Sequence, residues 1–174
     1  MPTITAPAPA APTPVRKAAP YENWRPPIIG VSLLVPVGAG ALVVGLLGCT
    51  MLPTGTVYGG QSLEQATQNV LHGAPGGLPL VRRVVLAWVQ MRRRKVITHV
   101  LATESMPRKD VEQLTYRDPR AEVRVLPTLQ VIDKLTPKGR LRALVGLQAL
   151  ATGETAYIEG DVVRTTGAHA EMTS

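Results

Sequence analysis

The longest apolar stretch of the chain lies between Pro27 and Leu52. Residues 27–49 read PIIGVSLLVPVGAGALVVGLLGC and contain no charged side chain. About 20 apolar residues in a helix cross the hydrocarbon layer of a bilayer, and a buried soluble helix is rarely apolar on every side over such a length. The pattern therefore predicts a transmembrane helix in residues 27–52. Pro36 does not contradict this prediction, because membrane helices tolerate a proline.

The pattern changes after this run and predicts a small folded domain. Residues 62–73, SLEQATQNVLHG, are typical of a short helix capped by Ser62 and ended by Gly73. Residues 78–104 allow two interpretations: one long amphipathic helix, or two strands that turn at MRRRK. Three later segments favour strands, residues 122–132, 141–152 and 155–166, with a hairpin turn at residues 152–154.

These elements predict an α+β fold in which a single N-terminal transmembrane helix precedes a small domain with an antiparallel sheet and one or two helices. Proline enrichment in the first residues predicts a disordered tail over residues 1–26. The predicted order is this tail, a transmembrane helix or signal segment at 27–52, a linker at 53–61, the α+β domain at 62–168 and a disordered tail at 169–174.

Charges beside the apolar run predict its orientation. Arg16, Lys17 and Arg25 precede the run, and no Lys or Arg follows it before Arg82. Positive flanking charge stays on the cytoplasmic side of a membrane. We therefore expect a single-pass protein of the cell membrane with a cytoplasmic N-terminus and an extracytoplasmic C-terminal domain.

The single cysteine, Cys49, ends the apolar run and has two interpretations. The residues Leu46-Leu47-Gly48-Cys49 resemble a bacterial lipoprotein processing site, which implies lipidation of the Cys49 thiol. Alternatively, Ala41, Gly45 and Cys49 are spaced by four, so they share one face of a helix. Small residues on one face allow close packing of membrane helices and self-association.

The chain is basic, with 19 Lys and Arg against 12 Asp and Glu and a formal charge of +7. Six of the basic residues form a cluster around the apolar segment VVLAWVQ: Arg82, Arg83, Arg92, Arg93, Arg94 and Lys95. We expect solvated charge at the edge of an element, although such a cluster can also bind anionic lipid or phosphate. We do not expect nucleic acid as a partner, because aromatic residues make up only 3% of the chain and the predicted orientation places the domain outside the cytoplasm.

Catalytic motifs are missing from the sequence. The histidines, His72, His99 and His169, match no ligand spacing, and neither a Gly-x-Ser-x-Gly nor a phosphate-binding Gly-Lys-Ser/Thr loop occurs. Acidic residues at 110–122 alternate with arginine and lysine, which is typical of surface ion pairs. These observations predict no enzymatic activity, no cofactor and no metal.

The predicted role is that of a membrane-anchored assembly subunit of a bacterial or phage-encoded envelope complex, of the secretion or conjugation type. Its partners would be the membrane and other protein subunits, which tethering concentrates on one surface. Three alternatives remain: a lipoprotein anchored through Cys49 with the same scaffolding role, a cytoplasm-facing basic domain that binds nucleic acid or anionic lipid, and an enzyme of an unrecognised family.

Overall fold

A computed structural model describes residues 25–164. Its largest sheet has six strands in the order β12-β11-β7-β8-β1-β5. The bounds of these strands are β1 (Ile28–Leu34), β5 (Thr54–Thr56), β7 (Leu80–Gln90), β8 (Lys95–Thr103), β11 (Ala156–Glu159) and β12 (Val162–Arg164). The sheet is mixed, since β1 runs parallel to β8 and β11 parallel to β7. The expectation of an antiparallel sheet is therefore wrong.

Two smaller sheets and four helices complete the part of the chain from residue 25 to residue 164. One sheet has the order β10-β3-β2, with β4 also paired to β3, and the other joins β6 to β9. These strands are β2 (Pro36–Val37), β3 (Ala41–Leu46), β4 (Thr50–Met51), β6 (Leu71–His72), β9 (Thr115–Tyr116) and β10 (Glu122–Pro127). The helices are α1 (Leu63–Gln68), α2 (Arg108–Val111), α3 (Thr128–Lys134) and α4 (Pro137–Thr152).

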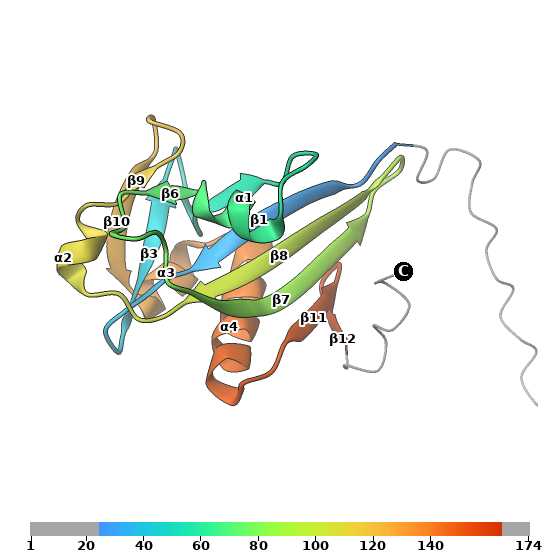
Figure 1. Ribbon diagram of the computed structural model, residues 1–174. Coiled ribbons are helices and arrows are strands. Elements are labelled where there is room, and N and C mark those ends of the chain that lie inside the picture. Colours follow the sequence, from blue (N-terminus) through green and yellow to red (C-terminus); the bar gives the residue numbers. More distant parts are fainter. Residues whose placement is uncertain (1–24, 165–174) are drawn as a thin grey trace, which may run out of the picture.

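Helices α1 and α4 lie on opposite faces of the large sheet (Figure 1), and an apolar cluster fills each face. On one face, Val31 and Leu33 of β1 pack in a cluster with residues of α1 and α2 and with Tyr116. On the other face, Leu34 belongs to a second cluster that includes residues of α3 and α4. Strand β1 thus has neighbouring strands on both sides and apolar side chains on both faces.

This double burial explains why the apolar run was mistaken for a membrane helix. A strand covered on both faces needs an almost unbroken apolar sequence, and such a run has the same composition as a membrane span. Residues 28–51 form β1 to β4, and Gly38 and Gly48 adopt positive φ angles of 59° and 72° in the turns between them. No helix within residues 25–164 is long and apolar enough to cross a membrane. The predicted transmembrane helix is wrong.

Several local predictions are confirmed. Ser62 caps α1 in a capping box with Gln65, although the helix ends at Gln68, before the predicted stop. Residues 78–104 form the hairpin of β7 and β8, which was one of the two interpretations. The predicted strand at 155–166 contains β11 and β12, whereas the one at 122–132 is right only for β10 and wrong from Thr128, where α3 begins.

The strand predicted at residues 141–152 is wrong, because this segment is the second half of α4. Its helix signals lie outside the segment itself. The side chain of Thr136 caps the N-terminus, Pro137 occupies the first turn, and Gly153 ends the helix with a left-handed φ of 75°. The predicted hairpin turn at 152–154 is this helix end. The predicted tails fall mostly on residues 1–24 and 165–174, which lie outside the described residues.

Candidate functional site

Two surface hollows flank helix α1 and share Gln61 and Asn69. The smaller, of about 230 Å³, lies between β5, α1 and the pair β6–β9, and the larger, of about 710 Å³, follows the outer side of α1. The smaller is lined by Thr56, Tyr58, Gln61, Ala66, Asn69, Val70, His72 and Arg117. The larger is lined by Gln61, Ser62, Glu64, Gln65, Gln68 and Asn69. We name the two together the α1 hollow.

Hydrogen bonds between glutamine side chains and the backbone hold the loops around α1. The backbone N–H of Tyr58 donates to Oε1 of Gln61 at 3.1 Å, which fixes the glycine-containing loop before the helix. Gln68 clamps the segment after the helix, because its Nε2 donates to the carbonyl of Leu78 at 2.9 Å and its Oε1 accepts from the N–H of Leu78 at 2.8 Å. The α1 hollow therefore has a preorganised frame.

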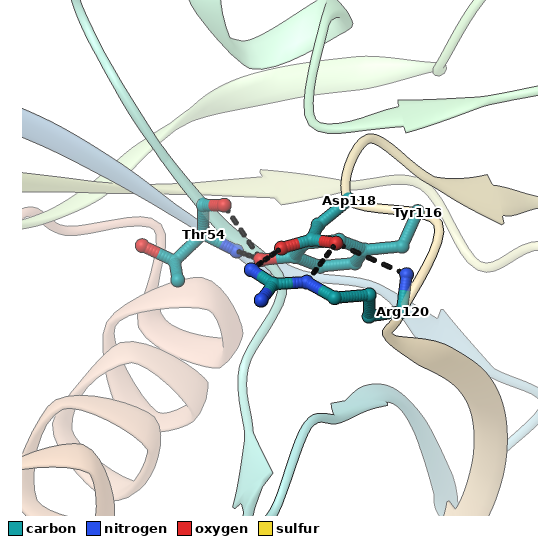
Figure 2. A network of polar contacts seen from close by, with 4 residues as sticks. All are labelled: Thr54, Tyr116, Asp118 and Arg120. Atoms are coloured by element: carbon teal, nitrogen blue, oxygen red, sulfur yellow. Dashed lines mark hydrogen bonds and ion pairs between the residues drawn. The ribbon is translucent and has the colours of Figure 1, made fainter.

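The smaller hollow is closed by the β6–β9 pair, which Tyr116 ties to strand β5. The Tyr116 hydroxyl donates to the carbonyl of Thr54 at 2.6 Å and accepts from the N–H of Thr54 at 2.8 Å, as Figure 2 shows. Burial of the phenol raises the pKa of Tyr116. The next residue, Arg117, donates its backbone N–H to the carbonyl of Val70 at 3.1 Å, which places Arg117 at the edge of the smaller hollow.

Arg117 is the cationic group of this hollow. Its neighbour Asp118 forms an ion pair with Arg120 at 2.8 Å (Figure 2), and the hydrogen bonds from Arg120 lower the pKa of Asp118 to about 2. The guanidinium of Arg117 makes no hydrogen bond or ion pair with the residues from 25 to 164. It is exposed at the rim, close to His72 and Asn69. Such a group can bind an anion.

The predicted basic cluster is divided along the β7–β8 hairpin. Arg82 donates to the carbonyls of Ala149, at 2.6 Å, and Glu154, so it caps the C-terminus of α4. Arg83 contacts His99. Residues 92–94 lie in the hairpin turn, which is closed by a hydrogen bond from the Met91 N–H to the Arg94 carbonyl at 2.9 Å, and Lys95 begins β8. The cluster therefore contains two structural arginines and a separate basic turn.

His99 is half-buried and neutral in the folded chain. Its Nδ1 lies 3.2 Å from Nη1 of Arg83, and since a guanidinium can only donate, Nδ1 accepts. Burial and the charge of Arg83 lower the pKa of His99 from 6.5 to about 4.

We expect His99 to make the folded state less stable in acid. The unfolded chain takes up this proton below pH 6.5, whereas the folded chain does so only near pH 4, so the free energy of unfolding falls across this window as the pH drops. Urea unfolding of the wild type and of His99→Asn measures the effect. The stability advantage of the wild type should shrink on acidification, and pH profiles that stay parallel would contradict the assignment.

The residues proposed for helix packing do not share a helix. Ala41 and Gly45 lie in β3, and a Cβ on Gly45 would lie 3.2 Å from the ring of Tyr116. Cys49 is exposed in the turn between β3 and β4. The apolar run before Cys49 is core strand. Lipidation of Cys49 stays a prediction.

Arg117, Tyr58 and Asn69 were not recognised from the sequence. The sequence pattern placed Arg117 in a segment of surface ion pairs. Only the fold shows that Asp118 forms its ion pair with Arg120 and that Arg117 borders the α1 hollow. His72 was noted only as a histidine without a ligand motif. His169 lies outside the described residues.

The sequence matches no family model and no curated protein, but the fold is similar to those of several solved structures. A MutT protein from Methanosarcina mazei Go1 is 15% identical with a TM-score of 0.51, covering 76% of this chain and 99% of its own. A MutT protein from Bacillus halodurans is 8% identical with a TM-score of 0.54, covering 79% and 95%. The ORF135 protein of E. coli is 11% identical with a TM-score of 0.54, covering 73% and 92%. The chain therefore has a mixed α/β, Nudix-like fold.

These findings correct the functional expectations. The fold is similar to that of the MutT proteins, and no helix in residues 25–164 could span a membrane, so the assignments as a membrane-anchored envelope subunit and as a single-pass protein of the cell membrane are wrong. The expectation that the chain is not an enzyme is contradicted as well, because the chain shares its fold with the MutT proteins of Methanosarcina mazei Go1 and Bacillus halodurans. That expectation rested only on the absence of familiar catalytic motifs from the sequence.

Sites where proteins act on phosphate groups commonly contain a divalent metal ion such as Mg²⁺, which carboxylates hold together with the phosphates. The residues of the α1 hollow do not fit such an ion. Glu64 is the one carboxylate among the lining residues, and within residues 25–164 no three His, Cys, Asp or Glu side chains come together as a metal site.

Proposed function

We propose that the α1 hollow binds a small molecule that carries a phosphate group, and that Arg117 contacts the phosphate. One observation carries the proposal: Arg117 borders the smaller hollow together with His72 and Asn69, and its guanidinium makes no ion pair with described residues. Guanidinium groups bind phosphate oxygens through two parallel hydrogen bonds. The proposal is consistent with a Nudix-like fold, whose solved examples point to hydrolysis.

The size and lining of the α1 hollow support a ligand larger than phosphate itself. The smaller part, of about 230 Å³, accommodates the phosphate, and the adjoining part offers about 710 Å³ for the rest of the molecule. Its lining is rich in amide groups, which donate and accept hydrogen bonds. The ring of Tyr58, which is 58% exposed, provides an apolar surface at the entrance.

Calorimetric titration of the full chain tests this function. The ligands are nucleoside diphosphates and triphosphates, sugar phosphates and the corresponding compounds without phosphate. We expect at least one phosphate compound to bind about tenfold or more tightly than its dephosphorylated counterpart, which corresponds to one charge-assisted contact. Equal affinity for the two, or no binding of any phosphate compound, would contradict the proposal. Phosphorus NMR of the same mixtures detects turnover and identifies the bond that is cut.

A further inference from the structure

The oxygen atoms along α1 determine whether a metal ion can bind there. Mg²⁺ requires six oxygen ligands in near-octahedral geometry. Proteins commonly supply some of these oxygens from carboxylates. In the α1 hollow the carboxylate is that of Glu64, and the remaining polar side chains are Gln61, Ser62, Gln65, Gln68 and Asn69.

Three of the four amide oxygens are already engaged within the protein. Oε1 of Gln61 accepts from the N–H of Tyr58 at 3.1 Å. Oε1 of Gln65 accepts from the N–H of Ser62 at 2.9 Å in the capping box, and the Ser62 hydroxyl accepts from Gln65 in return. Oε1 of Gln68 accepts from the N–H of Leu78 at 2.8 Å. These bonds fix the orientation of the three amides, so a metal ion could draw their oxygens together only by breaking the bonds that hold both loops of the hollow.

The charge of the hollow also disfavours a cation. Arg117 is positive and Glu64 is negative, so the lining side chains supply no net negative charge. Sites that bind divalent cations tune their affinity by the number of charged ligands.

We infer that α1 holds no resident divalent cation, and that the ligand of the α1 hollow is bound directly by Arg117 and the neighbouring polar groups. The second part of this inference rests on the proposed function, whereas the first part concerns the chain alone. The amides of Gln61, Gln65 and Gln68 hold the loops through hydrogen bonds. A metal site at these positions would need oxygen ligands that can turn toward the ion.

Titration of the full chain with Mn²⁺ alone tests the first part. Calorimetry and the electron paramagnetic resonance signal of free Mn²⁺ should show no saturable binding below about 1 mM. Saturable binding to the wild type that Glu64→Gln abolishes would overturn the inference. The double variant Gln65→Glu with Asn69→Glu adds two carboxylates on one side of α1, and glutamate still completes the capping box. This variant should gain Mn²⁺ binding. If it does not, a shortage of carboxylates is not the reason why α1 binds no divalent cation.

The second part is tested with the tightest phosphate compound found by calorimetry. Its dissociation constant should change less than about twofold between Mg²⁺ and EDTA, since no protein-bound ion contributes. A loss of tenfold or more in EDTA that is absent in Glu64→Gln would overturn the inference, because Glu64 would then hold the ion. The outcomes are distinguishable, because absence of any ligand binding refutes the proposed function and leaves the Mn²⁺ result standing.

Discussion

Arg117→Ala is expected to weaken binding of the phosphate-bearing ligand by roughly 10- to 100-fold, which corresponds to about 1.5–3 kcal/mol for hydrogen bonds to a charged group. The exposed guanidinium makes no ion pair with described residues, so its removal should leave the free energy of unfolding nearly unchanged. Calorimetry measures the affinity, and urea unfolding measures the stability of the same preparations.

Two further variants separate charge from geometry. Arg117→Lys keeps the positive charge but loses the planar pair of donors, so we expect an affinity between those of the wild type and the alanine variant. Arg124→Ala is the matched control, because Arg124 is an exposed arginine that forms an ion pair with Glu122 and does not line the α1 hollow. Equal losses for Arg124→Ala and Arg117→Ala would show that general charge, and not a site, attracts the ligand.

Gly146→Leu is expected to destabilise the fold by about 3 kcal/mol through overpacking. Helix α4 lies close to the large sheet at this residue. A Cβ there would lie 2.6 Å from Cδ1 of Leu34 and 3.3 Å from Cγ2 of Val85. Both neighbours are fully buried, so neither side chain has room to move away. Urea unfolding followed by circular dichroism measures the change.

Gln148→Leu is the control for this variant. It introduces the same side chain on the exposed side of the same helix, where substitutions change stability by about 0.5 kcal/mol or less. A Gly146→Leu variant as stable as this control would show that α4 does not pack on β1 and β7 as described, and the assignment of residues 28–34 to a core strand would then lose its main support.

The apolar run at residues 27–52 shows why composition alone misled the interpretation of the fold. Burial on two faces and burial in lipid select the same side chains, so hydropathy does not distinguish them. The turn signals inside the run, Gly38 and Gly48, do distinguish them, because both adopt positive φ where a continuous helix has none. Local signals that depend on only a few neighbouring residues, such as the Ser62 cap, were read correctly.

Helix α4 shows a different source of error. Leu, Val and Ala dominate residues 141–152 and gave a strand prediction, while the cap at Thr136 and the stop at Gly153 lay beside the segment and were not combined with it. The side chains that face the sheet are small, Ala143, Gly146 and Ala149, so the buried side of α4 lacks the large apolar residues that normally reveal a helix period.

The α1 hollow could not be derived from the sequence because its parts come from distant segments. Tyr58 and Asn69 flank α1, whereas Arg117 follows the strand pair formed by His72 and Thr115. Nothing in the local sequence distinguishes Arg117 from Arg120, and only the ion pair of Arg120 with Asp118 separates their roles. Sites assembled by tertiary contacts of this kind leave no short motif.

The most direct test of the proposed site is an NMR titration of the ¹⁵N-labelled full chain with the tightest phosphate compound. The chemical-shift changes should concentrate in residues 56–72 and 115–118, which border the α1 hollow. The side-chain signal of Arg117 should also change, and the changes should be lost in Arg117→Ala. Shifts confined to the basic turn at residues 91–95, or to the separate hollow between α4 and β12, would contradict the account.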